Sequence, residues 1–129
     1  MPDVREGVAL STYPDDWTAI AKAVKDAAGW RCVRCRHAHN RVGWRILTVH
    51  HLDGDKANCR WWNLAALCQR CHLTIQARVV LKQVWPWEHS EWFKPYAAGW
   101  YAKKYLGLEL TRDEVMERLD ELLALERIA

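Results

Sequence analysis

Two Cys-x-x-Cys pairs place the strongest constraint on how this chain can fold: Cys32 with Cys35, and Cys68 with Cys71. This spacing lets both thiolates of a pair bind one tetrahedral ion, and two pairs complete a shell of four sulfurs. Redox-active or unpaired cysteines are the alternative interpretation. A closed shell leaves no position for water or substrate, so we expect a structural Zn²⁺ site that stabilises the fold and performs no chemistry.

The rest of the sequence favours metal-binding thiols over disulfides. The five cysteines are an odd number, the amino terminus has no apolar run of the secretory kind, and no stretch approaches the roughly 20 apolar residues needed to cross a bilayer. We therefore predict a cytoplasmic protein that does not associate with membranes. Cys59 lies outside the pairs and has no assigned role. His37 and His39 could replace a ligand, but four cysteines already complete the shell, which favours exposed loop residues.

The 129 residues are enough for one domain, 1–129, and too few for two ordinary ones. Apolar residues at helical spacing predict a first helix over about 16–28. A core stabilised by the zinc site follows over about 29–84, and an aromatic, partly helical extension over about 85–129. In this extension Thr111-Arg112-Asp113-Glu114 matches a capping box that opens a final helix.

Thirty-two residues separate Cys35 from Cys68, more than the roughly 15–20 of an ordinary zinc ribbon. β-branched and apolar residues predict strands over 45–50 and 63–67, joined through a turn-rich loop over 53–58. A helix is expected from about Gln69 to about Gln83, before Trp85-Pro86. The predicted class is therefore α+β, with the order strand, loop, strand, helix.

The predicted elements place polar residues close to the zinc site. The first strand ends in His50 and His51, Asn63 begins the second strand, and His72 follows the last zinc cysteine on the first turn of the helix. The zinc would hold that helix start beside the strands, so that His50 and His72 could bind one divalent ion with open positions for phosphate and water. His51 would point the other way, or be displaced by the end of the strand, and would then be free to act as a base.

The runs Val49-His50-His51-Leu52, Asn63-Leu64 and Leu67-Cys68-Gln69-Arg70-Cys71-His72 resemble the HNH endonuclease motif in its zinc-knuckle subtype. The resemblance covers about 29–82. It implies a ββα-metal (His-Me finger) core flanked by amino- and carboxyl-terminal helices. By position, it makes His50 and His72 ligands of the catalytic ion and His51 the general base. It also implies that Asn63 braces the loop and orients that base.

The implied activity is hydrolysis of DNA phosphodiester bonds with one divalent ion, Mg²⁺, Mn²⁺, Ni²⁺ or Zn²⁺, cutting one strand per site. Some family members have a further metal ligand one helical turn after the last histidine, where this chain has Gln76, so waters would complete the shell. Similar small proteins occur in phage and mobile elements, which implies a bacterial or phage-infected cell.

The charge distribution agrees with a DNA partner. The whole chain carries +3, yet the segment from Ala27 to Trp87 has ten Arg or Lys against two Asp. Concentrated positive charge suits a polyanion. The predicted DNA contacts are Arg31, Arg34, Arg36, Arg41, Arg45, Arg70 and Arg78. The nine tryptophans favour core packing, with stacking on nucleic acid as the alternative.

Two other functions compete with the nuclease. A zinc-stapled DNA-binding module of the same fold would bind DNA without cutting it. A zinc nucleobase deaminase needs a His-x-Glu element before Pro-Cys-x-x-Cys, and the sequence has neither. The carboxyl-terminal extension matches no motif, and a homodimer or a partner protein could contact it.

Overall fold

The computed structural model describes residues 13–76 and 90–127. It is a small α+β protein whose sheet has two antiparallel strands, β1 (Leu47–His51) and β2 (Leu64–Cys68). The register pairs Leu47 with Cys68 and His51 with Leu64. A 3₁₀ turn, η1 (Trp61–Asn63), leads into β2, and α2 (Gln69–Gln76) follows it without a break. The predicted class and element order are confirmed, while the predicted continuation of this helix to Gln83 lies outside the described residues.

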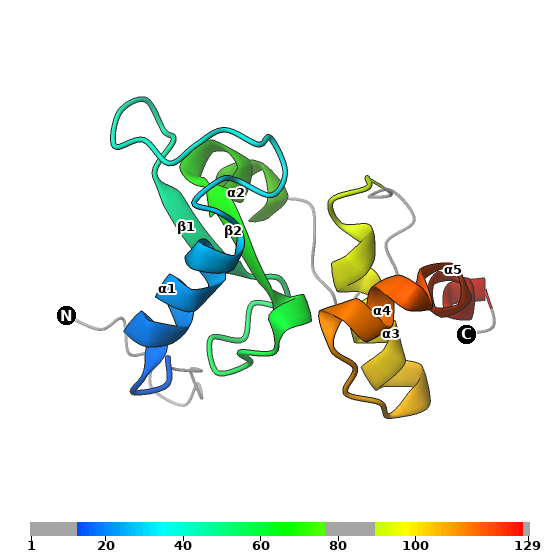
Figure 1. Cartoon of the computed structure of the whole chain (residues 1–129). Coiled ribbons are helices and arrows are strands. Elements are labelled where there is room, and N and C mark those ends of the chain that lie inside the picture. Colours follow the sequence, from blue (N-terminus) through cyan, green and yellow to red (C-terminus); the bar gives the residue numbers. More distant parts are fainter. Residues whose placement is uncertain (1–12, 77–89, 128–129) are drawn as a thin grey trace.

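Helices cover both faces of the sheet. The helix α1 (Trp17–Ala27) crosses one face, and α2 lies on the other (Figure 1). Alternation along β1 sends His51 toward Trp17 of α1, and sends Thr48 and His50 toward His72 of α2. All five residues of β2 are buried because of this two-sided cover.

Both strands begin later than their composition predicts. The carbonyl of Arg45 accepts from Asn40 N, and the carbonyl of Ile46 accepts from Gln69 N at the start of α2. These two residues therefore hydrogen-bond to a loop and to a helix end rather than to β2. Asn63 lies in the 3₁₀ turn, where its N–H donates to Arg60 O, so the second strand begins at Leu64.

The carboxyl-terminal extension forms three further helices and a 3₁₀ turn, and Figure 1 shows them gathered beside the sheet. These elements are α3 (Lys94–Leu106), α4 (Arg112–Glu117), α5 (Leu119–Leu123) and η2 (Ala124–Arg127). Phe93, Tyr96 and Tyr101 join the same buried cluster as Leu47 and Leu67, so α3 packs on the core of the sheet.

The capping box at Thr111 is confirmed, since Thr111 Oγ1 accepts from Glu114 N and Glu114 Oε1 accepts from Thr111 N. The expected single final helix is wrong: the chain bends at Arg118, and α4 and α5 are separate. The bend brings both Val115 and Leu122 onto the small residues of α3, where their side chains are fully buried.

None of the helices within the described ranges is long and apolar enough to span a bilayer.

Candidate functional site

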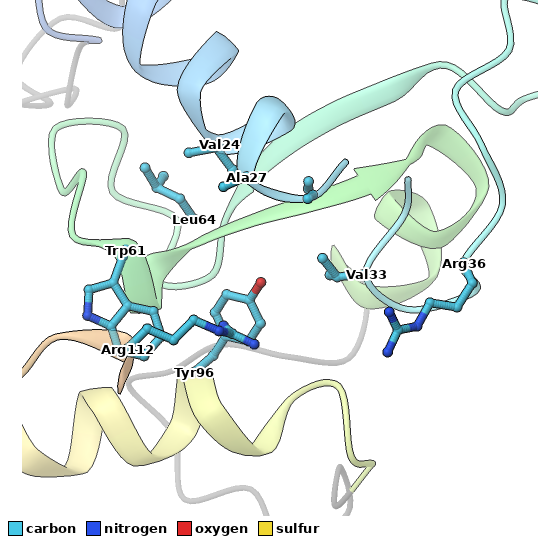
Figure 2. Close-up of a pocket in the computed structure, with 10 residues that line it drawn as sticks. Val24, Ala27, Val33, Arg36, Trp61, Leu64, Tyr96 and Arg112 are labelled. Carbon is cyan, nitrogen blue, oxygen red and sulfur yellow. The ribbon is translucent and has the colours of Figure 1, made fainter. Parts of the chain in front are cut away.

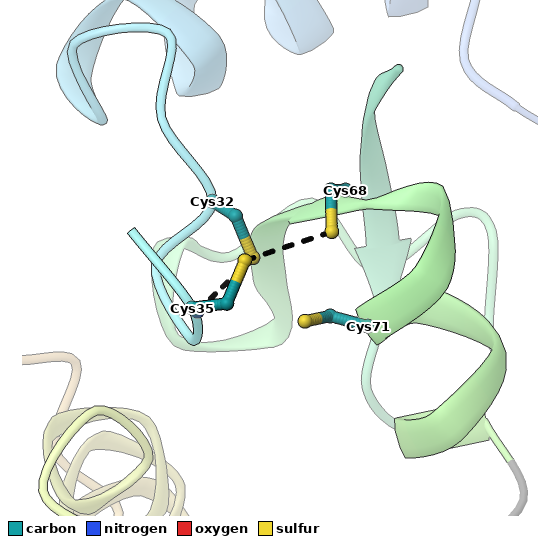
Figure 3. Close-up of side chains that lie close together, drawn as sticks. All are labelled: Cys32, Cys35, Cys68 and Cys71. Carbon is teal, nitrogen blue, oxygen red and sulfur yellow. Dashed lines mark hydrogen bonds between the residues drawn. The ribbon is translucent and has the colours of Figure 1, made fainter. Parts of the chain in front are cut away.

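The four cysteines of the two pairs come together. Cys32 and Cys35 lie on a turn after α1, Cys68 ends β2, and Cys71 lies on the first turn of α2. Their sulfurs all lie within 4.8 Å of one another and point toward a common space (Figure 3). This cluster could hold a structural metal ion such as zinc.

The geometry and chemistry of the donors fit a tetrahedral ion. A metal–sulfur distance of about 2.3 Å places two sulfurs of a tetrahedron about 3.8 Å apart. The sulfurs of Cys35 and Cys68 are 3.8 Å apart. Without a cation, burial raises the pKa of Cys71 to about 12. A bound cation favours the thiolates that such burial otherwise disfavours.

Hydrogen bonds form the turn that carries the first cysteine pair. Arg36 N donates to Cys32 O, Cys32 N donates to His37 O, and Val33 N donates to Ala66 O at the edge of β2. Arg36 takes a positive φ of 67°, which closes the turn. The sheet edge thus fixes the first pair beside the second one.

A second group of polar residues lies on the α2 side of the sheet. The ring centroids of His50 and His72 are 4.4 Å apart. Burial lowers the pKa of His50 to about 4, and the nearby rings of His72 and His51 act in the same direction. Burial also lowers the pKa of His72. Both imidazoles are therefore neutral at pH 7, the form in which a ring nitrogen binds a metal ion.

The hydrogen bonds around Thr48 determine the tautomer of His72. Thr48 Oγ1 lies 2.7 Å from the carbonyl oxygen of Leu67 and 2.8 Å from His72 Nδ1. A hydroxyl has one proton, and this one is donated to Leu67 O. Nδ1 of His72 must then be the donor to Thr48, which leaves Nε2 unprotonated. A histidine held in this way through Nδ1 has the usual arrangement of a metal ligand.

His51 lies on the opposite face of the sheet in an aromatic environment. Its ring centroid is 4.8 Å from that of Trp17 and 5.7 Å from that of Tyr13. The residue is only 6% exposed, and its buried Nε2 has no hydrogen-bond partner within residues 13–76 and 90–127. Burial lowers the pKa of His51, although Asp53 and Asp55 oppose this change. The imidazole is therefore neutral and packs beneath two aromatic rings, and it makes a hydrogen bond with the backbone of Lys56.

Asn63 is fully buried and holds the loop that joins the two strands. Its Oδ1 accepts from Asp53 N, and its Nδ2 donates to Asp53 Oδ1 and to Asn58 O. Asp53 Oδ2 accepts a further bond from Asn58 Nδ2. Since Asp53 lies two residues after His51, this network fixes the chain at the point where it leaves β1.

The predicted DNA contacts have diverse environments. Arg31, Arg36, Arg41 and Arg70 are exposed, and Arg34 and Arg45 are half-buried with their Nη1 atoms directed at sulfurs; Arg78 lies outside the described residues. Sequence reasoning missed these arginine–sulfur contacts, the bond from His72 to Thr48, and the cover of Trp17 and Tyr13 over His51. The sequence contains one sign of the arginine–sulfur contacts, namely that Arg34 lies between Cys32 and Cys35.

Other predicted polar residues lie outside both groups. His39 Nδ1 accepts from Leu47 N at the start of β1, and His37 is exposed. Cys59 is half-buried away from the four-sulfur cluster, and Gln76, at the end of α2, is exposed.

A cavity of about 300 Å³ lies between α1, β2 and α3. Figure 2 shows Val24 and Ala27 on one side of it and Trp61, Tyr96 and Arg112 on the other. Among the described residues, Arg36 is the one predicted site residue on its wall. The cavity is thus distinct from the histidine pair.

Comparison of the chain with protein-family models, with curated proteins and with solved structures finds no match.

Proposed function

We propose that this chain is a metal-dependent DNA endonuclease of the HNH type. The observation that carries the proposal is the contact of His50 with His72, whose ring centroids are 4.4 Å apart. These two imidazoles, neutral at pH 7, come from the end of β1 and the start of α2. The order β1, β2, α2 and the four-cysteine cluster beside it support the ββα-metal fold with a structural zinc ion.

In this proposal His50 and His72 hold one divalent ion. Nε2 of His72 is the ring nitrogen that is free to bind the ion, since Nδ1 is hydrogen-bonded to Thr48. The exposed Gln76 is not needed as a ligand, and waters complete the shell. When bound, the ion stabilises negative charge on the scissile phosphate and on the departing 3′ oxygen.

His51 is the proposed general base. Its lowered pKa keeps the imidazole unprotonated at neutral pH, and its Nε2 has no partner among the described residues. It takes a proton from a water molecule, whose oxygen forms the new bond to phosphorus while the bond to the 3′ oxygen breaks. The products carry a 5′-phosphate and a 3′-hydroxyl. Asn63 positions the loop that begins after His51.

DNA is the proposed partner, and each site cuts one strand. Exposed arginines around the first cysteine pair and on α2 supply positive charge for phosphate contacts: Arg31, Arg36, Arg41 and Arg70. A second copy or a partner protein on the carboxyl-terminal helices would allow both strands to be cut.

A DNA-binding module without turnover is the second candidate, and the burial of His51 favours it. A general base must reach the attacking water, yet His51 is 6% exposed beneath Trp17 and Tyr13. Under this alternative His51 is a core residue, and the nuclease requires the two aromatic rings to move away from it.

Supercoiled plasmid incubated with the full chain and Mg²⁺, Mn²⁺, Ni²⁺ or Zn²⁺ tests the proposal. We expect nicking by the wild type and by His37→Ala, an exposed histidine outside the site, and none by His72→Ala or His51→Phe. Equal nicking by all four proteins would indicate a contaminant. DNA binding that weakens with salt, without cutting under any ion, would establish the binding module instead.

A further inference from the structure

We propose that Arg34 and Arg45 form a cationic clamp on the four-cysteine cluster and that this clamp retains the metal ion. The proposal rests on the proposed binding of a divalent ion by the four cysteines, and it is independent of nuclease activity. It assigns a role in metal retention to two arginines whose sequence context predicts DNA contacts.

Each of the four sulfurs has a nearby N–H donor. Arg34 Nη1 donates to Cys71 Sγ across 3.4 Å. Arg45 Nη1 lies 3.3 Å from Cys35 Sγ and 4.0 Å from Cys68 Sγ. The remaining sulfur, on the fully buried Cys32, accepts from the backbone N–H of Cys35 across 3.4 Å. Two guanidinium groups and one backbone N–H therefore supply one donor to each of the four sulfurs.

The clamp also links parts of the chain that are distant in sequence. Arg34 lies inside the first cysteine pair, yet it contacts a sulfur of the second pair 37 positions later. Arg45 lies just before β1 and reaches one sulfur from each pair. Loss of either guanidinium therefore removes a hydrogen bond to a sulfur and also weakens the contact between the two cysteine pairs.

Charge explains why arginine suits these positions. Four thiolates around a divalent ion carry a net charge of −2, and two guanidinium groups neutralise it. Both arginines are half-buried, so water screens this attraction less than it screens an exposed pair. Hydrogen bonds from a charged donor are stronger than neutral ones, and partners of metal ligands commonly change metal affinity by roughly 10 to 100-fold.

Zinc release from the zinc-loaded full chain to a colorimetric chelator tests the clamp. We expect Arg34→Gln and Arg45→Gln to release zinc roughly tenfold faster than the wild type, and the double variant to release it faster still. Arg41→Gln removes the same charge from an exposed site in the loop before β1, and its release rate should match the wild type. Equal rates for Arg34→Gln, Arg45→Gln and Arg41→Gln would overturn the proposal, as would a wild type that binds no zinc.

A spectroscopic measurement separates the clamp from a general loss of stability. In the cadmium-substituted protein, the cadmium NMR resonance reports on hydrogen bonds to the coordinating sulfurs. We expect Arg45→Lys, which keeps the charge and the apolar stem, to fold and yet to shift this resonance, and Arg41→Lys to leave it in place. An unchanged resonance in Arg45→Lys would refute the Arg45 contact. Neither measurement uses DNA, so failure of the nuclease proposal would leave both results interpretable.

Discussion

The Thr48 hydroxyl accepts a hydrogen bond from Nδ1 of His72 across 2.8 Å. It donates its own proton to Leu67 O, so the direction of both bonds is fixed. This places the free lone pair of His72 on Nε2. The contact joins β1 to α2 on the face of the sheet that also carries His50.

Thr48→Val should therefore weaken binding of the proposed catalytic ion. Valine keeps the shape of threonine but removes the acceptor that orients His72, and loss of such a partner costs roughly tenfold or more in metal affinity. Thr48→Ser should retain the affinity of the wild type. Titration with Mn²⁺ or Ni²⁺ of zinc-loaded protein measures the affinity, and ¹⁵N chemical shifts of the His72 ring report the tautomer. Identical shifts in Thr48→Val and the wild type would show that Thr48 does not select the tautomer.

Replacement of His51 should separate activity from stability. The His51 ring packs against Trp17 and Tyr13, so His51→Ala would remove buried contacts as well as the proposed base. Phenylalanine fills the same space without Nε2, which has no partner in the described part of the chain and whose burial costs about 1–3 kcal/mol. Because phenylalanine also loses the hydrogen bond with the Lys56 backbone, we expect His51→Phe to unfold at a urea midpoint close to that of the wild type and to lose nicking. A large loss of stability in this variant would mean that the hydrogen bond with Lys56 contributes more than the burial of Nε2 costs.

Removal of the proposed metal ion from the four-cysteine cluster should unfold the cysteine core. Zinc binding by such four-ligand sites contributes free energy of the same order as the stability of a whole small domain. We expect Cys68→Ser, or a strong chelator, to abolish the cooperative thermal transition followed by circular dichroism. Cys59→Ser is the matched control, since Cys59 lies outside the cluster. A Cys68→Ser protein that melts like Cys59→Ser would contradict a structural role for the cluster.

Stability should depend on pH through His50. Burial lowers the pKa of His50 to about 4, whereas a histidine in an unfolded chain titrates near 6.5. Between these values the unfolded chain binds a proton that the folded chain does not. The free energy of unfolding contributed by this group therefore falls as the pH decreases from about 6.5 toward about 4, and it levels off below that range.

Urea unfolding of wild type and His50→Asn from about pH 7.5 to about pH 5, with the zinc content measured at each pH, tests this dependence. The difference in the free energy of unfolding between the two proteins should change steadily with decreasing pH, in favour of His50→Asn. Parallel curves for the two proteins would indicate that His50 keeps an ordinary pKa in the fold.

The sequence predicts the parts of the site that depend on spacing. Cys-x-x-Cys pairs have a local geometry that fixes their role, and the convergence of all four cysteines follows from it. The helix over about 16–28 and the two strands lie within one or two residues of their expected positions. The first strand begins later than predicted because Ile46 hydrogen-bonds to the start of α2. Composition carries no information on that long-range partner.

Contacts between residues on different helices and strands could not be predicted from spacing. Thr48 is an ordinary strand residue in sequence, and its bond to His72 exists only once α2 packs on β1. The cover of Trp17 over His51 likewise requires α1 to lie on the other face of the sheet. The bend at Arg118 follows from packing of Leu122 on α3, whereas the capping box at Thr111 specifies only where the helix begins.

Gly99 determines how closely the carboxyl-terminal extension approaches the sheet. A Cβ added at Gly99 would lie 2.7 Å from Cβ of Trp62 and 3.0 Å from Cζ2 of Trp61. Cβ of Trp62 is fixed to the backbone of η1 and cannot rotate away, so alanine would push α3 and η1 apart. In an ordinary helix, replacing glycine by alanine stabilises by about 1 kcal/mol. Here overpacking should reverse the sign, with Gly99→Ala destabilising by about 1–3 kcal/mol.

The same displacement should reach the proposed site, since Asn63 is the last residue of η1 and holds the loop after His51. We expect Gly99→Ala to lower the urea midpoint and also the nicking rate at a temperature where the variant is fully folded. Gly107→Ala, which changes a glycine at the end of α3 where an added Cβ meets open space, should lower stability through its positive φ without affecting the rate in the folded state. If Gly99→Ala were instead more stable than the wild type, α3 could not lie against Trp62 as described, and the extension would have no direct route to Asn63.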